Sequence, residues 1–448
     1  MSEPRITWVN HASYILDYGI FKLITDPWIE GSAFNDGWDL LVPSVFDYQE
    51  FETISHIWFS HEHPDHFAPS CLKQIPETLR PDITVLYQET KDRKVLDFCQ
   101  QLGFNTLELR EGAWQKLGPD VELLCGKVPF YDSWLFTKVG GRSLLNLNDC
   151  VLTNPSEVKV IREKCGSVDV LLSQFSYADW IGNPDQIELR TEAAAEKLKR
   201  LKIQIELLQP QYLIPFASFV YFSHETNFYL NDAHNTVMDA VEFAQALDVE
   251  ALAMYPGDVW AYGDTSHNDK SLPRYTEAYE LSQKSLRKSP IVDTDELEKL
   301  AIQYCERILH HNDGVMLKLC GLFNIMMFQT LKVALWDGRS FDFDLKEGLQ
   351  RRGGEENDWA PDITTDSDSL AFMLRVDWGL DSLLVNGRFR ASAAGSQKML
   401  RVFALSTLNN TGRRFDLNLL FDRKLLLRIA QKLGWSTKAR GERSSRVT

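Results

Sequence analysis

The sequence predicts an α/β fold followed by a second, α+β domain. Three observations carry this prediction: apolar strand-like runs alternate with amphipathic helical segments, a histidine-rich loop follows a buried strand, and 448 residues exceed what one core usually serves. We expect a first domain over residues 1–262, a linker over 263–292, an accessory domain over 293–435 and a disordered tail over 436–448.

The elements of the first domain follow in chain order from their patterns. Apolar runs predict strands at 54–59, 84–87, 121–124, 134–139, 143–147 and 168–172, and amphipathic periodicity predicts helices at 91–102, 190–207 and 232–247. The strands at 134–139 and 143–147 form a hairpin that turns at Gly140 and Gly141.

The loop after the strand at 54–59 carries three imidazoles and a carboxylate: His61, His63, Asp65 and His66. Side chains two residues apart at a strand end can converge, so His61 and His63 are expected to hold one ion, with Asp65 and His66 facing a second. Imidazole and carboxylate ligands suit zinc, iron, manganese or nickel. The alternative is a histidine-rich surface loop that binds nothing.

The H-x-H-x-D-H loop resembles the signature of the metallo-β-lactamase superfamily, which implies an αββα sandwich holding two divalent metal ions. In that superfamily an aspartate at the end of an earlier strand orients the metal loop, and Asp26 after Leu23-Ile24-Thr25 fits this role. A later strand ends in an aspartate that bridges both metals, and Asp149 fits; its alternative is a polar turn. The resemblance thus makes Asp65 and Asp149 the expected catalytic carboxylates.

An upstream segment, Asn10-His11-Ala12-Ser13, resembles the G-H-A/S-S opening of the lactonase-like and phospholipase-like branch, with Asn10 in place of glycine. His11 is either a pocket residue or a packed, hydrogen-bonded histidine.

Two ligands of this superfamily have no direct counterpart. Relatives supply a histidine between the loop and the bridging aspartate, whereas this chain has none from 67 through 148; Asp120, Glu122 and Asp132 are candidate substitutes, and Glu122 is favoured because it lies on the strand at 121–124. The branch also ends a strand with I-P-x-H, where this chain has Ala217. His224 is expected to complete the second metal site instead, or else to face substrate or solvent.

Taken together, these segments resemble the catalytic part of the CMP-N-acetylneuraminate monooxygenase family over roughly residues 5–260. That family hydroxylates a sugar nucleotide using iron and carries a Rieske module, which needs Cys-x-His ligands. No Cys-x-His occurs in this chain, so the resemblance implies that electrons come from a separate donor protein or from the substrate.

Composition narrows the remaining classes. A net charge of −15 and a pI near 5.2 disfavour nucleic-acid binding. The first residues lack a signal-peptide core, and seven cysteines without C-x-x-C fit a reducing cytoplasm. The most apolar stretch, 314–336, is interrupted by polar residues and is predicted to be a buried helix and strand, not a membrane span. No dinucleotide or P-loop fingerprint is present.

The polar loop at 173–186 follows a core strand, where this fold places substrate contacts, so Tyr177 and Trp180 are either pocket walls or packing residues. In the second domain we expect helices at 295–309 and 368–378 and a hairpin formed by 330–337 and 339–345. The segment 367–389 faintly resembles a sterol-carrier lipid-binding domain; a plain accessory domain is the alternative.

Two enzymatic functions follow, with a third possibility. With iron, the site would activate dioxygen and the protein would hydroxylate a small polar or sugar-nucleotide-like molecule. With zinc, bound water with a pKa of about 7 would hydrolyse an ester, lactone or phosphodiester. The additional carboxylate favours iron over zinc. The third possibility is a metal-binding protein that has lost activity.

Overall fold

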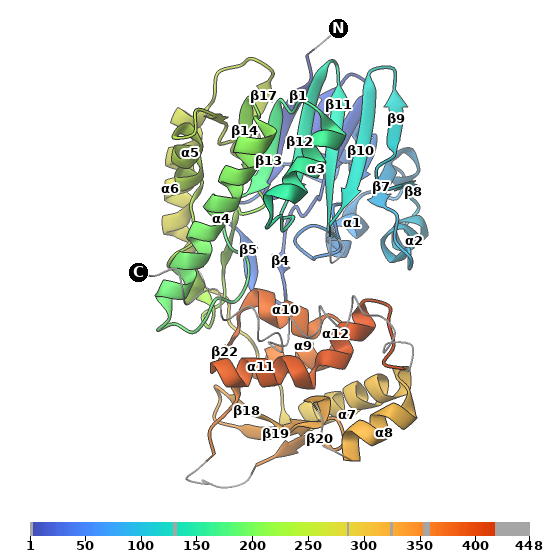
Figure 1. Cartoon of the computed structure of the whole chain (residues 1–448), viewed down its shortest axis with the longest axis vertical. Helices are drawn as coiled ribbons and strands as arrows, with labels where there is room; N and C mark the ends of the chain where they lie inside the picture. Colours follow the sequence, from blue (N-terminus) through green and yellow to red (C-terminus); the bar gives the residue numbers. More distant parts are fainter. Residues whose placement is uncertain (1–2, 129–131, 285, 323–325, 353–358, 417–448) are drawn as a thin grey trace. The chain divides into compact units, whose positions relative to one another are not determined.

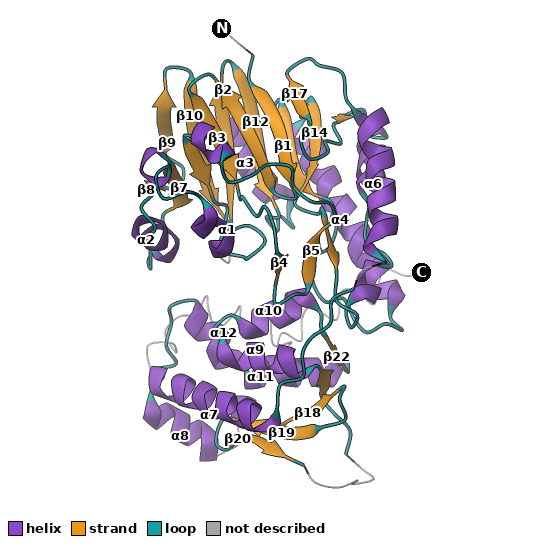
Figure 2. Cartoon of the chain, turned by 180° about the vertical axis from the view of Figure 1, so that it is seen from behind, coloured by secondary structure: helices purple, strands orange, loops and turns teal. Residues whose placement is uncertain are grey.

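The computed structural model describes residues 3–128, 132–284, 286–322, 326–352 and 359–416. The chain divides into two compact units, Met1–Arg287 and Lys288–Thr448. The first is an αββα sandwich of two sheets between layers of helices, and the second is α+β (Figures 1 and 2). Among the described helices, none combines the length and the apolar character that a membrane span requires.

One sheet of the sandwich has the order β17-β1-β2-β3-β6-β7-β8. Its strands are β1 (Arg5–Asn10), β2 (Ser13–Tyr18), β3 (Phe21–Thr25), β6 (His56–Trp58), β7 (Thr84–Gln88), β8 (Asn105–Leu109) and β17 (Val259–Ala261). Strands β3, β6, β7 and β8 pair in parallel. Strands β1 and β3 both pair antiparallel with β2, so β1 runs in the same direction as β3. The ends of these parallel strands therefore share one edge of the sheet.

The facing sheet has the order β16-β14-β13-β12-β11-β10-β9. Its strands are β9 (Trp114–Gly118), β10 (Val121–Lys127), β11 (Ser133–Val139), β12 (Arg142–Asn148), β13 (Val170–Gln174), β14 (Tyr212–Phe216) and β16 (Glu250–Ala251). A small sheet with the order β15-β5-β4 joins β4 (Ser32–Ala33), β5 (Trp38–Leu40) and β15 (Val220–Phe222). Apolar side chains from both large sheets form one continuous core.

Helices cover the outer faces of the two large sheets (Figure 1). The helices of this unit are α1 (Pro69–Gln74), α2 (Lys94–Gln101), α3 (Pro155–Cys165), α4 (Ile187–Leu208), α5 (Val237–Gln245) and α6 (Asn268–Ser282), and the short 3-10 turns are η1 (Glu50–Thr53), η2 (Arg80–Asp82) and η3 (Phe228–Asn231). Helix α2 packs on β7 and β8, whereas α4 and α5 pack on β13 and β14. These contacts bury the apolar stripes that predicted the helices.

The boundary between the two units falls within the segment expected to be a linker, 263–292, but most of that segment is structured. It contains α6, whose Tyr275 is fully buried in the core of the first unit and donates a hydrogen bond to the Met254 carbonyl at 2.7 Å. The first unit therefore extends to Arg287, near the end of the expected segment, and not only to residue 262. The polar composition that suggested a linker belongs to the exposed face of this helix. The expected tail at 436–448 lies outside the described residues.

The second unit has a five-stranded sheet of order β20-β19-β18-β21-β22. Its elements are α7 (Thr294–His311), α8 (Gly314–Leu322), η4 (Met326–Phe328), β18 (Leu331–Leu335), β19 (Ser340–Asp344), β20 (Gly348–Arg351), β21 (Ile363–Thr365), α9 (Ser367–Arg375), α10 (Gly379–Asn386), β22 (Phe389–Ala391), α11 (Ala393–Val402) and α12 (Ala404–Asn410). The helix at 295–309 and the hairpin of β18 and β19 lie where the sequence predicts them. The resemblance to a sterol-carrier domain stays a prediction.

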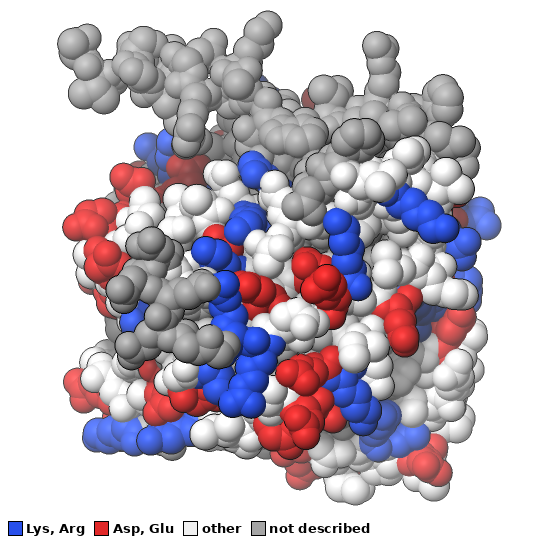
Figure 3. All heavy atoms as spheres, turned by 90° about the horizontal axis from the view of Figure 1, so that it is seen from below, with Lys and Arg blue, Asp and Glu red and all other residues white. Residues whose placement is uncertain are grey.

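Basic and acidic side chains are interspersed over the face of the molecule in Figure 3. Such a mixture does not create the strong field of one sign that draws in polyanions.

Candidate metal centre

Two groups of possible metal ligands form where strands of both large sheets end. His11 follows β1, and the loop 61–66 lies a few residues after β6, which follows β3 in the sheet order. Asp149 directly follows β12 of the other sheet. The fold therefore brings together side chains that lie more than 130 residues apart in the chain.

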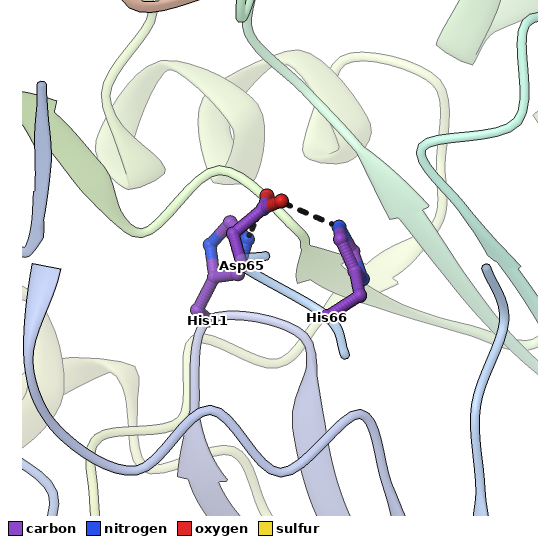
Figure 4. Close-up of side chains that lie close together, drawn as sticks. All are labelled: His11, Asp65 and His66. Carbon is purple, nitrogen blue, oxygen red and sulfur yellow. Dashed lines mark hydrogen bonds and ion pairs between the residues drawn. The ribbon is translucent and has the colours of Figure 1, made fainter. Parts of the chain in front are cut away.

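The first group consists of His11, Asp65 and His66, and all three are buried (Figure 4). The Oδ2 atom of Asp65 lies 3.3 Å from His11 Nε2 and 3.2 Å from His66 Nε2. We call these three residues the buried group. One ligand atom from each lies within 4.8 Å of those of the other two, which is close enough for a single ion to bind all three.

The second group consists of His61, His63 and Asp149. His61 Nε2 lies 2.8 Å from His63 Nδ1 and 3.6 Å from Asp149 Oδ2. We call these residues the accessible group, because the side chain of Asp149 is 19% exposed to solvent. His61, with a side chain that is 2% exposed, is the enclosed member of this group. Asp149 Oδ2 also lies 3.7 Å from His66 Nε2, so this carboxylate stands between the two groups.

The donor set fits a pair of divalent transition-metal ions. Each group offers two imidazoles and one carboxylate. The Oδ1 atoms of Asp65 and Asp149 are buried without a hydrogen-bond partner among the described residues. Buried carboxylate oxygens normally find a donor or a cation, so these two oxygens are suited to bind metal.

Asp26 holds the ligand loop in place from the end of β3. Its carboxylate accepts hydrogen bonds from Ser60 N at 2.7 Å, Ser60 Oγ at 2.7 Å and Asn148 Nδ2 at 2.8 Å. Its Oδ2 atom also lies 3.0 Å from His66 Nδ1, which leaves Nε2 of that ring for a metal. Ser60 Oγ lies 2.9 Å from His61 Nδ1 and orients the second ring in the same way.

Four residues around the centre adopt left-handed backbone: His11 (φ 38°), Asp26 (φ 36°), Asn148 (φ 54°) and Ala217 (φ 48°). Each follows or ends a strand, β1, β3, β12 and β14 respectively. This conformation is unfavourable for residues with a Cβ atom and persists where the surroundings enforce it. At His11 the enforcement includes Asn10, which accepts from His11 N at 2.9 Å and donates to the Val42 carbonyl at 2.7 Å.

The charges of the centre are strongly coupled. Burial lowers the pKa of His61 well below its ordinary value, against the attraction of Asp149. Burial opposes charge on His66 too, but Asp65 and Asp149 outweigh it and raise the pKa of His66 well above its usual range. Burial alone would raise the pKa of Asp65, yet His66 and His11 hold it well below the ordinary value. Without metal, a proton on His66 thus balances the carboxylates.

Of the acidic candidates for the missing histidine, the structure brings Asp132 to the centre. Asp132 Oδ1 lies 3.9 Å from His61 Nε2, and burial and Asp149 together raise the pKa of Asp132 well above its ordinary value. Glu122 lies opposite Lys138 of β11 and Lys116 of β9 in the register of the sheet. It stands five residues from Lys127, where β10 reaches the centre, or roughly 16 Å along a strand. Glu122 therefore does not join either group, contrary to the expectation from its strand position.

His224 also lies outside both groups. Its Nδ1 atom is 2.8 Å from Thr226 Oγ1, and its backbone forms a β-bridge with Arg287. His11 occupies the place that the sequence interpretation gave to His224. The amide of Ala217 donates to the His11 carbonyl at 3.0 Å, so the strand end at which the resemblance implied a histidine lies against His11.

Tyr177 and Trp180 lie in the loop that follows β13. Tyr177 is buried, its hydroxyl donates to the Leu230 carbonyl, and its ring packs edge-on against His234 with centroids 5.2 Å apart. These contacts give Tyr177 a packing role. Trp180 is half-buried and does not belong to either ligand group.

Residues 5–217 match the family model described as "Beta-lactamase superfamily domain". The cytidine monophosphate-N-acetylneuraminic acid hydroxylase of Cricetulus griseus is 28% identical over 248 residues, which cover 52% of this chain and 43% of that protein. A Homo sapiens protein described as the inactive form of this hydroxylase is 28% identical over 253 residues, covering 54% of this chain and 50% of that protein. The chain thus spans about half or less of the length of these relatives.

Among solved structures, CmlA, described as a diiron β-hydroxylase from Streptomyces venezuelae, is similar with a TM-score of 0.42 and 15% identity, covering 58% of this chain and 54% of CmlA. The family match and the hydroxylase relatives confirm both resemblances seen in the sequence.

Proposed function

We propose that this chain, whose residues 5–217 match the β-lactamase superfamily model, is an iron-dependent hydroxylase of the metallo-β-lactamase superfamily. The observation that carries the proposal is the composition of the two ligand groups. Each combines two histidines with one carboxylate, the donor set that non-haem iron oxygenases use with open positions for dioxygen and substrate.

We propose that His11, Asp65 and His66 hold one ion and that His61, His63 and Asp149 hold the other, with Asp149 reaching toward both. Bound iron would supply the capacity to bind and activate dioxygen. Asp26 and Ser60 fix the orientation of the imidazoles, and burial keeps water from the first group. The side chains of His63 and Asp149 retain access to solvent, so substrate approaches from the accessible group.

The proposed substrate is a small polar or sugar-nucleotide-like molecule, which the names of the hydroxylase relatives support. We propose that the electrons come from a donor outside these 448 residues, which contain no Cys-x-His pair of the Rieske type.

The test is elemental analysis of protein purified without added metal, followed by oxygen-electrode assays with a chemical reductant and cytidine monophosphate-N-acetylneuraminic acid as the first probe. We expect iron to predominate, and oxygen uptake to accompany the gain of one oxygen atom by the probe. Asp149→Asn should lose metal and uptake, whereas the matched control Glu122→Gln should retain both, because Glu122 lies far along β10 from the centre.

The same donor set also favours a second candidate, a zinc-dependent hydrolase of an ester, lactone or phosphodiester. Two histidines and a carboxylate hold zinc in several hydrolases, where the open position activates water. Activity that requires zinc and proceeds equally well without oxygen would establish this function in place of the hydroxylase.

A further inference from the structure

Lys197 stands beside the centre although it belongs to neither ligand group. Helix α4 packs on β13 (Figure 1). Ser173 Oγ of that strand donates to Gln204 Oε1 of the helix at 2.6 Å. Ser173 is the register partner of Asn148 in the parallel pair β12 and β13. The next residues, Asp149 and Gln174, therefore leave neighbouring strands at the same edge, about one strand spacing of 4.8 Å apart.

Gln174 fixes the Lys197 side chain at this edge. Lys197 Nζ donates to Gln174 Oε1, and Gln174 Nε2 donates to the Ala217 carbonyl at 3.3 Å. Ala217 in turn donates from its amide to the His11 carbonyl at 3.0 Å. A series of three hydrogen bonds, through Gln174 and Ala217, thus links the ammonium group of Lys197 to the backbone of His11 in the buried group.

The positive charge of Lys197 lacks a paired carboxylate. Within the described residues no carboxylate lies within 4.0 Å of Nζ, and Gln174 is neutral. Burial lowers the pKa of Lys197, while the carboxylates of Asp179, Asp149 and Asp132 act in the opposite direction from farther away. An ammonium group has three N–H donors, so two directions remain after the bond to Gln174. A half-buried cation with unused donors is costly unless an anion completes it.

We propose that Lys197, held by Gln174, forms an anion subsite next to the metal pair and binds a carboxylate or phosphate group of the substrate. The inference rests on the proposed function in that the anion belongs to the substrate of the metal centre. The substrate would then be an anionic molecule that places its charged group beside Lys197 while its reacting position lies at the metal pair. The neutral Gln174 contributes orientation and leaves the charge of Lys197 for the ligand.

The test measures binding of inorganic phosphate and, separately, of acetate to the metal-loaded protein by calorimetry, with metal content determined on the same samples. Lys197→Gln should weaken binding of the preferred anion about tenfold or more, because a charge-assisted hydrogen bond is lost. Lys197→Arg should restore most of the affinity. Lys199→Gln is the matched control, since Lys199 is on the same helix but 71% exposed and pairs with Glu196 at 3.5 Å.

The two anions distinguish a phosphate subsite from a carboxylate subsite. If Lys197→Gln binds phosphate and acetate each as tightly as the wild type does, with metal content unchanged, the inference is overturned. Absence of metal from the wild-type protein would overturn the proposed function, and the comparison of anion affinities with Lys197→Gln would still decide the role of Lys197. Parallel loss of anion affinity in Lys199→Gln would show a general charge effect and would also contradict the subsite.

Discussion

The buried and the accessible ligand groups have the same composition but different surroundings. His11, Asp65 and His66 are enclosed, and Asp26 contacts the His66 ring directly. His63 and Asp149 retain solvent access. The buried group is thus supported like a structural site and the accessible group is open like a reactive one.

This difference separates two tasks within one centre. Rigid support sets geometry and slows exchange of an ion, whereas solvent access allows ligands to enter and leave. We expect perturbations of the buried group to change the fold as well as metal binding, and perturbations of the accessible group to change metal binding alone.

The largest expected effect is that of Asp26→Asn. The new amide nitrogen would face the donors Ser60 N, Ser60 Oγ and Asn148 Nδ2, and His66 would lose its carboxylate partner. We expect the free energy of unfolding to fall by about 3 kcal/mol and the ion of the buried group to be lost, as measured by urea denaturation and elemental analysis. Asp97→Asn, at an exposed surface pair, is the control and should leave both unchanged.

The two groups should also lose their ions at different rates. In the wild type a chelator should remove metal in two phases, the accessible ion first. His63→Ala should abolish the fast phase and His11→Ala the slow one, each weakening its own site at least about a hundredfold. Elemental analysis after timed chelation measures this. A single phase in the wild type, or loss of both ions in His63→Ala, would contradict the separation of the groups.

The pH dependence of metal binding should differ as well. The pKa of His66 is raised well above its ordinary value of 6.5, so an ion entering the buried group at neutral pH must displace a proton. The pKa of His61 is lowered well below that value, so this ring is already neutral. Affinity of the buried group should therefore rise about tenfold per pH unit as long as the pH is below the raised pKa of His66, and level off above that pKa, the pH dependence expected for one displaced proton.

Calorimetry of His63→Ala in buffers of different ionisation enthalpy should show this proton release. In the metal-free protein the same raised pKa stabilises the fold below pH 6.5, and that contribution is lost as the pH rises through the pKa of His66. Proton release that is equal for His63→Ala and His11→Ala would argue against the difference between the groups.

Among the acidic residues near the accessible group, Asp132 should matter and Glu122 should not. Asp132 lies 3.9 Å from His61 Nε2, so Asp132→Asn should weaken binding of the accessible ion about tenfold, because a bound cation favours the ionised carboxylate and the substitution removes that carboxylate. Glu122→Gln should leave metal affinity unchanged and shift stability by less than about 0.5 kcal/mol. Metal titrations of the two variants measure both. The reverse ranking would restore Glu122 as the substitute ligand.

The smallest effect is expected for His224→Ala. The His224 ring interacts with Thr226 and lies in neither group, so both ions should remain. Loss of one ion with the fold intact would return His224 to the centre.

The sequence predicts what local order determines. The H-x-H-x-D-H loop lies within six residues of chain, and Asp26 and Asp149 follow apolar strands, so their meeting follows from the shared edge of parallel strands. The choice between Asp132 and Glu122 depends on which end of β10 and β11 reaches the loop, and the hydrogen bond from Ser133 Oγ to the Ser60 carbonyl sets this. No local pattern encodes that long-range contact.

The same limit explains the other differences. His224 and His11 were both candidates by residue type, but only the backbone contact between Ala217 and His11 decides which ring enters the centre. The sequence does not distinguish Lys197, because one lysine in an amphipathic helix has no pattern of its own; the only signal is Gln174, a polar residue at the end of a core strand. The expected linker contains the boundary between the units, but the sequence does not show that α6 within it packs on the first unit, because this helix is mostly polar and has few buried residues such as Tyr275.

The left-handed backbone at His11, Asp26, Asn148 and Ala217 bears on the order of folding events. These conformations are unfavourable in isolated strands and are held by contacts between segments far apart in the chain, such as Asn148 with Asp26 and Ala217 with His11. Contacts of high sequence separation form late, after loop-closure entropy has been overcome. We therefore expect the ligand cage to be unformed in the folding transition state, so that metal slows unfolding and leaves the folding rate nearly unchanged.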